Sequence, residues 1–277
     1  MKKNNIAFTF ATAEVSRLGQ LFIMIIELLT GKLKLKKLYD QYLLENRPPE
    51  FFWDDAIKKL QLTIKTNFQE GSYIPKEGKL IVIANHAFGV ADGVSICSVI
   101  SKVRQDYKMV THKVLRQADA VKDKILPIDF NETKEALLTN INTRKDAETV
   151  LKNQGVIVLF PSGRIATKKN LRKHEKADDG EWKLWVSKLI LKTKSPVLPI
   201  YFDGQNSQWY HMANKLGLTF RYSLCMYELK RKIGDDIYMY FGSLISYENL
   251  AKIGDIRDIT KYLRAATYSL DPHLNNN

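Results

Sequence analysis

His86 and Asp92 are the two side chains of this sequence best suited to move a proton. Imidazole is matched to proton transfer near neutral pH, and a positioned base of this kind contributes ~10² to 10⁴ in rate. Asp92 stands where a helix is expected to begin, so the helix dipole favours its carboxylate. Gly89, between them, permits a chain reversal that returns the carboxylate to the imidazole. The pair predicts a general base with an orienting carboxylate and no covalent nucleophile.

The segment around this pair predicts a strand, a turn and a helix. Residues 79–84 form a short apolar run typical of a buried strand, and residues 94–100 read as a buried helix. Ligands of α/β proteins bind beyond the carboxyl ends of the strands, which favours chemistry here. The alternative is structural, with Asp92 capping the helix and the His86 ring packed on Phe88. Taken alone, the two residues leave both interpretations open.

A second polar group, Phe160 to Arg164, follows the apolar run 156–159. Gly163 lets backbone amides approach a ligand, and Arg164 offers a planar, permanently charged donor for phosphate or carboxylate. Ser162 is disfavoured as a nucleophile because the Gly-x-Ser-x-Gly elbow is missing. The loop that follows is basic and predicts a clamp for an anionic headgroup or for coenzyme phosphates, the alternative being a solvated charge run. Its basic residues are Arg164, Lys168, Lys169, Arg172, Lys173 and Lys176.

A third segment, residues 197–207, runs from an apolar strand into a polar loop. We expect the strand, 197–202, to belong to the core. Asn206 and Ser207 are candidates for the lining of a pocket, because the loop leaves the strand at the edge of the sheet that the other two segments share.

The order of the expected elements predicts an α/β fold, a single domain with a largely parallel central sheet flanked by helices. Pro48 and Pro49 separate a helical N-terminal extension, residues 1–50, from a domain of residues 51–277. Further strands are expected at 107–110, 125–128 and 237–241, and helices at 132–151, 182–191 and 256–270.

The extension carries an apolar helix followed by lysines. Its apolar residues recur at helical spacing, and the apolar block is shorter than the ~18 residues that a membrane span needs, so no transmembrane span is predicted. No secretion signal is recognisable either. The segment suits a helix in the membrane interface, where each basic residue contributes ~1 kcal/mol, or else a helix packed on its own domain. The residues concerned are Val15, Leu18, Phe22, Ile25 and Leu29, then Lys32, Lys34, Lys36 and Lys37.

The composition limits the classes of molecule that the protein is expected to bind. The chain has 277 residues and a formal charge of +13, which indicates an acidic partner: nucleic acid, an anionic membrane surface or a phosphorylated substrate. Nucleic acid is not expected, because no recognised binding motif is present. Cys97 and Cys225 lie in apolar surroundings and predict buried free thiols in a reducing compartment, so we expect the protein to face the cytosol.

The three segments together resemble the 1-acylglycerol-3-phosphate acyltransferase superfamily of glycerolipid acyltransferases. Asn85-His86 with Asp92 is similar to its histidine–aspartate motif, residues 160–164 to its Phe-Pro-Glu-Gly-Thr-Arg block, and residues 197–200 to its Val-Pro-Ile strand, in the same order. Two features depart from the usual pattern: five residues instead of four separate His86 from Asp92, and Ser162 replaces a glutamate. Both departures resemble the bacterial hemolysin-like branch, which includes ornithine-lipid acyltransferases.

The resemblance implies O-acyl transfer from acyl-coenzyme A or acyl carrier protein to the hydroxyl of a lysolipid, in a glycerolipid-acyltransferase-like domain. His86 would be the base and Asp92 its partner, with no metal and no bound cofactor. Peripheral attachment to the cytoplasmic side of the inner membrane is implied as well. The family's arginine between the two motifs has no clear counterpart in residues 127–131, and Lys134 or Arg144 is named only as a candidate substitute. The substrate-binding candidates are Asn85, Gly89, Ser162, Gly163, Arg164, Lys168, Lys169 and Asn206.

Three alternatives stay open at this point. The acceptor could be lysophosphatidate specifically, or the enzyme could hydrolyse the acyl thioester with water. The chain could also be a non-catalytic basic protein that binds membrane or nucleic acid, for which strongly salt-dependent binding is expected.

Overall fold

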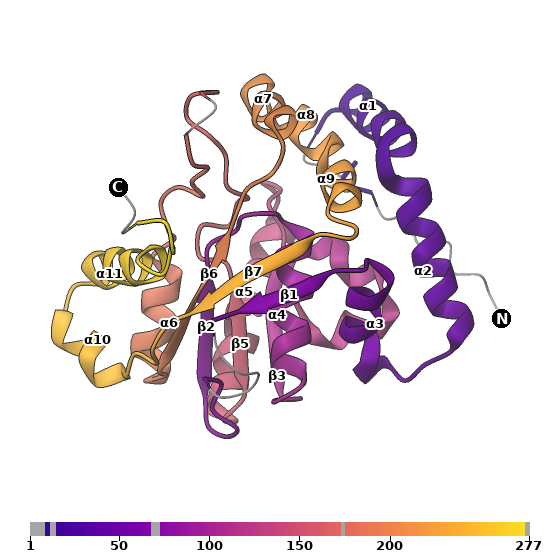
Figure 1. Cartoon of the computed structure of the whole chain (residues 1–277). Helices are drawn as coiled ribbons and strands as arrows, with labels where there is room; N and C mark the ends of the chain where they lie inside the picture. The colour runs from indigo at the N-terminus through magenta and orange to yellow at the C-terminus, as the bar shows by residue number, and fades with distance from the viewer. Residues whose placement is uncertain (1–8, 12–14, 68–72, 173–174, 275–277) are drawn as a thin grey trace.

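The computed structural model describes residues 9–11, 15–67, 73–172 and 175–274, and it is organised around one seven-stranded sheet (Figure 1). The strands lie in the order β1-β7-β6-β2-β5-β3-β4. Their bounds are β1 Thr63–Thr66, β2 Leu80–Ala84, β3 Tyr107–His112, β4 Ile125–Ile128, β5 Val156–Leu159, β6 Val197–Asp203 and β7 Asp236–Phe241.

Five neighbouring strands, from β6 to β4, run parallel, whereas β7 is antiparallel to β6 and β1 is parallel to β7. The predicted α/β fold with a largely parallel sheet is therefore confirmed. Every residue of β2 is buried, as expected of a strand covered on both faces. In the register, Ile83 of β2 lies between Leu159 of β5 and Pro199 of β6, so these three strands end side by side.

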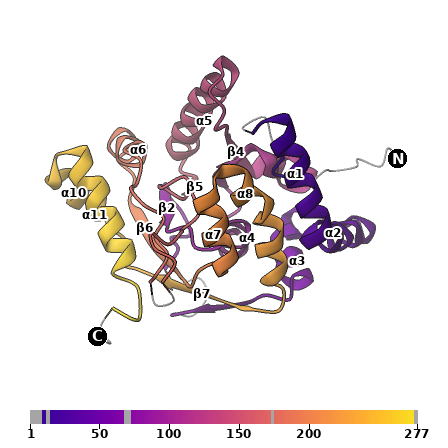
Figure 2. The ribbon, with the colours of Figure 1, turned by 90° about the horizontal axis from the view of Figure 1, so that it is seen from above.

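Helices cover both faces of the sheet, and side chains alternate between two cores. Leu80 and Val82 face one core, beneath α3 (Phe52–Lys59) and α4 (Val90–Ser101). Ile81 and Ile83 face the other core, whose helices are α5 (Lys134–Lys152), α6 (Trp185–Thr193), α10 (Tyr247–Ile253) and α11 (Ile256–Tyr268). The view from above shows the two groups of helices on opposite sides of the strands (Figure 2).

The N-terminal part is a long helical segment: α1 (Arg17–Glu27), a π-helical turn η1 (Leu28–Lys32) and α2 (Leu33–Glu45). Asn46 ends α2 in the left-handed conformation, and a short 3-10 turn η2 (Pro49–Phe51) leads into α3. The predicted break at Pro48 and Pro49 is confirmed, while the division of the chain into residues 1–50 and 51–277 stays a prediction. Within the described residues, no helix has both the length and the apolar character to cross a bilayer.

Several elements were not predicted from the sequence. Three short helices follow β6, namely α7 (Gln208–Leu216), α8 (Leu218–Ser223) and α9 (Cys225–Arg231), and two 3-10 segments follow β3, η3 (Lys113–Gln117) and η4 (Asp119–Lys124). Helix α4 begins at Val90, two residues before Asp92 and four before the apolar run 94–100 that was expected to form the buried helix. Cys97 and Cys225 are buried free thiols, as predicted.

Candidate active site

His86 and Asp92 form a hydrogen-bonded pair just beyond the carboxyl end of β2. His86 Nδ1 lies 2.8 Å from Asp92 Oδ2; the imidazole is partly exposed and the carboxylate is fully buried. The same oxygen accepts backbone N–H groups from Phe88 at 2.8 Å and Gly89 at 2.9 Å. An ionised carboxylate is an acceptor only, so three converging donors suit it. The aspartate therefore orients both the imidazole and the turn.

The turn between the two residues depends on Gly89. Its φ of +88° lies in the region that glycine adopts at no steric cost, and it directly precedes the first residue of α4. A Cβ built on Gly89 would come within 2.7 Å of Ile165 Cδ1, so a larger residue here requires the Ile165 side chain to shift. Asp92 is the third residue of α4, near the positive end of the helix dipole. The five intervening residues thus still bring carboxylate and imidazole together.

The neighbouring strands fix the position of His86. Its ring stacks on Phe160, which follows β5, with the centroids 4.2 Å apart and an angle of 22° between the planes. Of the structural alternative, the capping of α4 by Asp92 is present, while the ring stacking of His86 is with Phe160. The backbone amide of Ala166 donates to the carbonyl of His86 at 2.6 Å. Residues from β2 and from the loop after β5 together hold the imidazole.

Asn85 has a different place from the one expected of a substrate-binding residue. Its amide donates to the carbonyl of Phe202 at 3.0 Å and accepts from the amide of Phe202 at 2.7 Å. Asn85 therefore joins the ends of β2 and β6, and it lies outside the described lining of the cavity next to His86. A role in binding substrate stays a prediction for this residue.

A cavity of about 540 Å³ opens at the carboxyl ends of the parallel strands, and the three predicted segments meet in it. His86 and Gly89 come from the first segment, Gly163 and Arg164 from the second, and Asn206 from the third. These are the residues that the shared edge of a parallel sheet was expected to bring together.

One end of the cavity is cationic. It is lined by Arg144 of α5 and by Arg164, Lys183 and Lys188. Of the two substitutes named for the missing arginine, Arg144 lies in this lining, whereas Lys134 is outside its described part. The guanidinium of Arg144 lies over the Trp185 ring, 6.0 Å from the centroid.

Asp129 accompanies these cations in the lining. Burial by itself raises the pKa of Asp129, but hydrogen bonds from Lys113 and Asn131 outweigh it and hold the pKa below the ordinary value. This carboxylate is therefore already neutralised by Lys113, at 2.7 Å, and subtracts little from the positive charge of the cavity.

The Phe160 segment is shaped by a tight turn. Gly163 has a φ of +68°, and Ser162 is buried, with its hydroxyl donating to the carbonyl of Arg164 at 3.0 Å. The Arg164 guanidinium donates to the carbonyl of Asp179 at 3.1 Å and lies against Gly180, where a Cβ would clash with it. Arg164 is thus directed along the rim of the cavity, while Ser162 stabilises the turn.

The two lysines of the basic loop and Asn206 have separate places. Lys168 is buried and donates to the carbonyl of Arg172, whereas Lys169 is exposed; both are outside the described lining. Asn206 is buried in the lining, and neither of its side-chain polar atoms has a hydrogen-bond partner among the described residues. Arg164 and Asn206 are therefore brought together, and Lys168 and Lys169 are not.

The other end of the cavity is apolar and adjoins a second cavity of about 150 Å³. Phe10, Val90, Val114 and Leu115 line both. The inner cavity extends between α2, α3 and α4, and its walls are almost wholly hydrocarbon and aromatic. Its other residues include Leu38, Trp53, Val94, Ala118 and Met226.

Sequence reasoning missed His112, which ends β3 and lines the cavity beside Phe130. Its Nδ1 accepts the backbone amide of Val114 at 3.1 Å, which places the proton of the neutral ring on Nε2. Its ring stacks on Phe130 with the centroids 5.7 Å apart. One signal in the sequence could have identified His112. Like His86, it lies at the end of a strand that was expected to belong to the parallel sheet.

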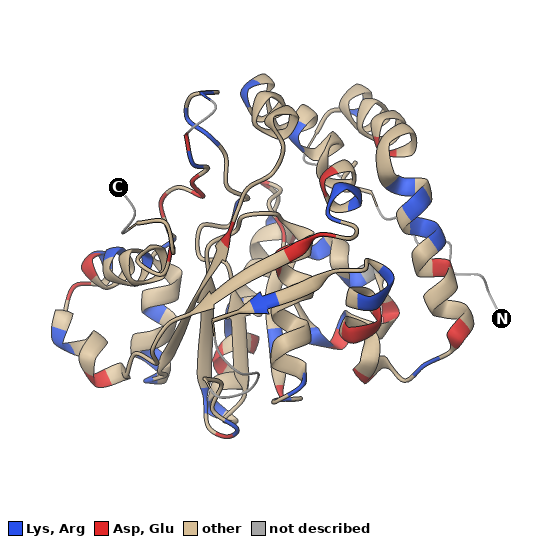
Figure 3. Cartoon of the chain, in the orientation of Figure 1, with Lys and Arg blue, Asp and Glu red and all other residues tan. Residues whose placement is uncertain are grey.

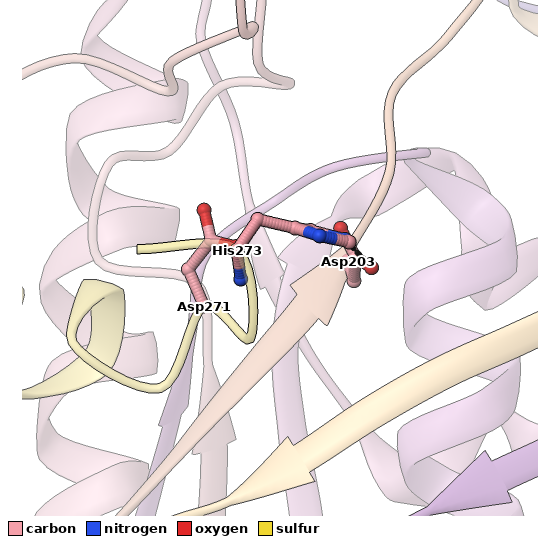
Figure 4. Close-up of side chains that lie close together, drawn as sticks. All are labelled: Asp203, Asp271 and His273. Carbon is pink, nitrogen blue, oxygen red and sulfur yellow. Dashed lines mark hydrogen bonds and ion pairs between the residues drawn. The ribbon is translucent and has the colours of Figure 1, made fainter. Parts of the chain in front are cut away.

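Asp203, Asp271 and His273 form a second polar group, where the C-terminal tail meets the end of β6 (Figure 4). Their ligand atoms lie within 4.8 Å of one another. Asp271 Oδ2 already accepts Lys176 Nζ at 2.6 Å, and His273 Nε2 lies 3.1 Å from Asp203 Oδ2. An ammonium on the carboxylate opposes a bound cation, and the group fastens the tail to the basic loop.

Comparison with known proteins places the chain near lipid acyltransferases. A family described as Acyltransferase matches residues 41–277. A lyso-glycine lipid O-acyltransferase of Phocaeicola vulgatus is 24% identical over 156 residues, which are 54% of this chain and 53% of that protein, so the match spans about half the relative's length. The protein of the same name from Bacteroides thetaiotaomicron is 25% identical over 207 residues, 71% of this chain and 72% of that protein.

Among solved structures, the 1-acyl-sn-glycerophosphate acyltransferase of Thermotoga maritima is similar, with a TM-score of 0.49 and 17% identity. The alignment covers 90% of this chain and 86% of that one.

Proposed function

The chain belongs to the acyltransferase family, and on this basis we propose that it is an O-acyltransferase that moves a fatty acyl group from a thioester to the hydroxyl of a lysolipid. The observation that supports this most directly is the position of the His86–Asp92 pair. It lies on the wall of a cavity that is cationic at one end and apolar at the other, as an amphipathic lipid requires.

The proposed chemistry begins at the imidazole. With the Nδ1–H donated to Asp92, the lone pair of His86 is on Nε2, which takes the proton of the acceptor hydroxyl. The oxygen attacks the thioester carbonyl, and the tetrahedral intermediate expels the thiolate, which receives the proton from the imidazolium. One C–O bond forms and one C–S bond breaks. Asp92 stabilises the imidazolium and keeps its orientation.

The donor is proposed to be acyl-coenzyme A or acyl carrier protein, and no bound cofactor is needed. The fatty chain fits the apolar end and the inner cavity behind it, which share four lining residues. Exposed cations at the rim, Arg144 and Arg164 among them, suit the phosphates that either carrier brings.

The acceptor is proposed to be a lysolipid with an anionic headgroup held at the cationic end, by Arg164 and the turn at Gly163. The two relatives act by name on lyso-glycine lipid, and we extend that class, a lysolipid built on an amino acid, to this chain. Lyso-ornithine lipid is a second member of the class. Asn206, the buried amide in the same lining, is proposed to contact the acceptor.

Helix α1 is proposed to hold the protein on an anionic membrane surface, on the cytoplasmic side of the inner membrane. Its inner face holds Gly19, Ile23 and Glu27, while large apolar side chains also face outward, which a helix of a soluble domain avoids. Leu18 of α1 is 81% exposed, and Leu29 of η1 is 74% exposed. Burial raises the pKa of Glu27, which accepts the amide of Phe10 at 2.7 Å. Lysines of α2 follow the apolar stretch, as Figure 3 shows.

The test is a panel of acceptors. Purified protein is incubated with isotope-labelled acyl-coenzyme A or acyl carrier protein and, in turn, lyso-glycine lipid, lyso-ornithine lipid and lysophosphatidate, and the products are separated by mass. We expect a diacylated amino-acid lipid that His86→Ala does not form. Exclusive acylation of lysophosphatidate would overturn the acceptor class. Release of free fatty acid without consumption of any lysolipid would replace transfer by hydrolysis.

A further inference from the structure

The α7–α8 segment exposes an unusual number of large apolar side chains. Both helices are short and follow the polar loop after β6. Single exposed apolar residues are ordinary, but a contiguous group on one face marks an interaction surface. The exposed fractions are 63% for Trp209, 42% for Met212, 66% for Leu216, 38% for Leu218 and 38% for Phe220.

Helix α7 carries large apolar side chains on its outer face, as α1 does. Its inner face buries Tyr210, His211 and Ala213, with the His211 ring fully inaccessible to solvent. A helix that packs on a soluble domain turns its apolar face inward and a polar face outward. In α7 the outer face also presents an indole and two long hydrocarbon side chains, those of Met212 and Leu216.

This outward face is continuous with that of α1. A Cβ built on Gly19 of α1 would lie 3.2 Å from the hydroxyl oxygen of Thr219 in α8, which shows how closely the helices pack. The rings of Phe22 and Phe220 meet edge to face, with centroids 5.1 Å apart. Figures 1 and 2 show α1, α7 and α8 together at the end of the molecule where the parallel strands finish.

A basic rim borders the face. The side chain of Gln208 donates to the carbonyl of Leu171 at 3.2 Å, and Lys215 donates to the carbonyl of Lys169, so α7 is tied to the basic loop. The exposed side chains of Lys169, Arg172 and Lys215 therefore lie beside the apolar group. Hydrocarbon surrounded by cations is complementary to the interface of an anionic bilayer, and tryptophan is enriched at that depth.

We propose that α7 and α8 form a second membrane-inserting element, which enters the interface of an anionic bilayer together with α1. The inference rests on the proposed function for its α1 half. Tyr210, Arg221 and Tyr222 of the same two helices line the active-site cavity, so insertion of this face brings the cavity against the lipid surface that supplies the acceptor.

Trp209 is the reporter for the test, in a chain that carries Trp185→Phe. Trp53 and Trp182 are buried in the protein, whereas Trp185 is partly exposed and lines the cavity, so it is removed from the signal. The full chain is mixed with vesicles of equal parts phosphatidylglycerol and phosphatidylcholine that carry bromine on the acyl chains. We expect quenching and a blue shift of the emission, both absent in Trp209→Phe. The double variant Trp209→Ser/Leu216→Ser should partition into the vesicles at least ~10-fold less, as loss of two interfacial apolar side chains predicts.

The control is Leu244→Ser/Tyr262→Ser, which removes two exposed large side chains, at 44% and 46%, away from α7 and α8. Its partition should equal that of the unaltered chain. Equal partition of the α7 variant would overturn the proposal. Sedimentation in the absence of lipid gives a second outcome that would overturn it. If the unaltered chain is a dimer and the α7 variant is a monomer, the apolar face contacts a second copy of the chain and not a membrane.

Activity separates this inference from the proposed function. With a short-chain acceptor and donor free in solution, the α7 variant should keep the rate of the unaltered chain and lose it only on vesicles. Vesicle insertion with no acyl transfer to any acceptor would overturn the proposed function and support the second membrane-inserting element. Transfer at full rate on vesicles by the α7 variant would overturn the second membrane-inserting element and leave the proposed function unaffected.

Discussion

Asn85 and Phe202 are joined by two hydrogen bonds, of 3.0 and 2.7 Å, between one side-chain amide and both polar groups of one backbone unit. This contact fixes the end of β2 to the end of β6, and His86 is the next residue. We predict that Asn85→Asp lowers the free energy of unfolding by ~1–3 kcal/mol, because a carboxylate oxygen would face a carbonyl. The rate of acyl transfer should fall as well. Urea titration measures the loss of stability, and the rate measured below the unfolding temperature shows the effect on activity alone.

Asn67 supplies the control for that prediction. It makes the same double contact with Phe241, at 3.1 and 2.8 Å, and neither residue belongs to the described lining of the cavity. Asn67→Asp should lose comparable stability and keep its activity. If the two variants retain equal activity, the Asn85 contact does not position His86.

Removal of either partner of the His86–Asp92 pair, the proposed base and its orienting carboxylate, is predicted to abolish most of the transfer. His86→Ala and Asp92→Asn should each lower the rate by at least ~10²-fold, since the base or its orientation is lost. Single-turnover kinetics with circular dichroism would show loss of chemistry in a folded protein. His273→Ala breaks another histidine–aspartate pair, that with Asp203 at 3.1 Å, and should leave the rate unchanged. Near-full activity of His86→Ala contradicts the mechanism.

Gly89→Ala is predicted to destabilise the turn and misplace the pair. The cost of a left-handed conformation for a residue with a Cβ is ~1–3 kcal/mol, and contact with Ile165 adds to it. Gly78 has a similar φ of +83°, and a Cβ on it meets nothing within 4 Å. Gly78→Ala therefore reports the backbone strain alone, and thermal unfolding of the two variants should differ. Equal unfolding temperatures would show that Ile165 gives way.

His211 is predicted to make the protein sensitive to acid. Burial, with the charge of Lys168 nearby, lowers its pKa to about 4 from an ordinary 6.5. As the pH falls below 6.5 the unfolded chain gains a proton that the folded chain does not, so stability declines until the pH reaches about 4. Urea titrations between these limits should show a shallower decline for His211→Gln. Identical slopes would mean that the ring is charged in the folded protein.

The inner cavity is predicted to select the acyl length. Val94→Phe fills part of its wall with an aromatic ring. Exclusion of about two methylenes costs ~1.6 kcal/mol, so preference for a palmitoyl over a decanoyl donor should fall ~10-fold. Competition between the two donors measures this ratio directly. Leu244→Phe, outside the cavity, is the control. An unchanged donor ratio in Val94→Phe would show that the fatty acyl group does not bind in the inner cavity.

The parts of the fold that the sequence predicted are those with strong local signals. β2, β5 and β6 are short apolar runs buried on both faces, and their polar successors had to meet because parallel strands end at one edge. His86, Gly163, Arg164 and Asn206 follow those strands and do line one cavity. Asp92 was expected at a helix start and is found there.

The features that were not predicted from the sequence depend on contacts between distant residues, which no local sequence pattern indicates. In α7 large apolar side chains face outward as well as inward, so its periodicity does not mark a single apolar face, and the helix was not predicted. The inner cavity is assembled from α2, α3, α4 and η3, which are distant in sequence. Lys168 is buried although the next residue, Lys169, is exposed, since the path of the loop decides which lysine turns inward.

The placement of Asp92 at the third residue of α4 has one more consequence. The carboxylate reaches the amides of Phe88 and Gly89 because it belongs to the first helical turn, whatever the length of the segment that leads from His86 to the helix. The constraint is on the position within the helix and not on the number of residues between base and acid. A turn with a glycine just before the helix can therefore accommodate one extra residue while the aspartate keeps its hydrogen bond to the imidazole.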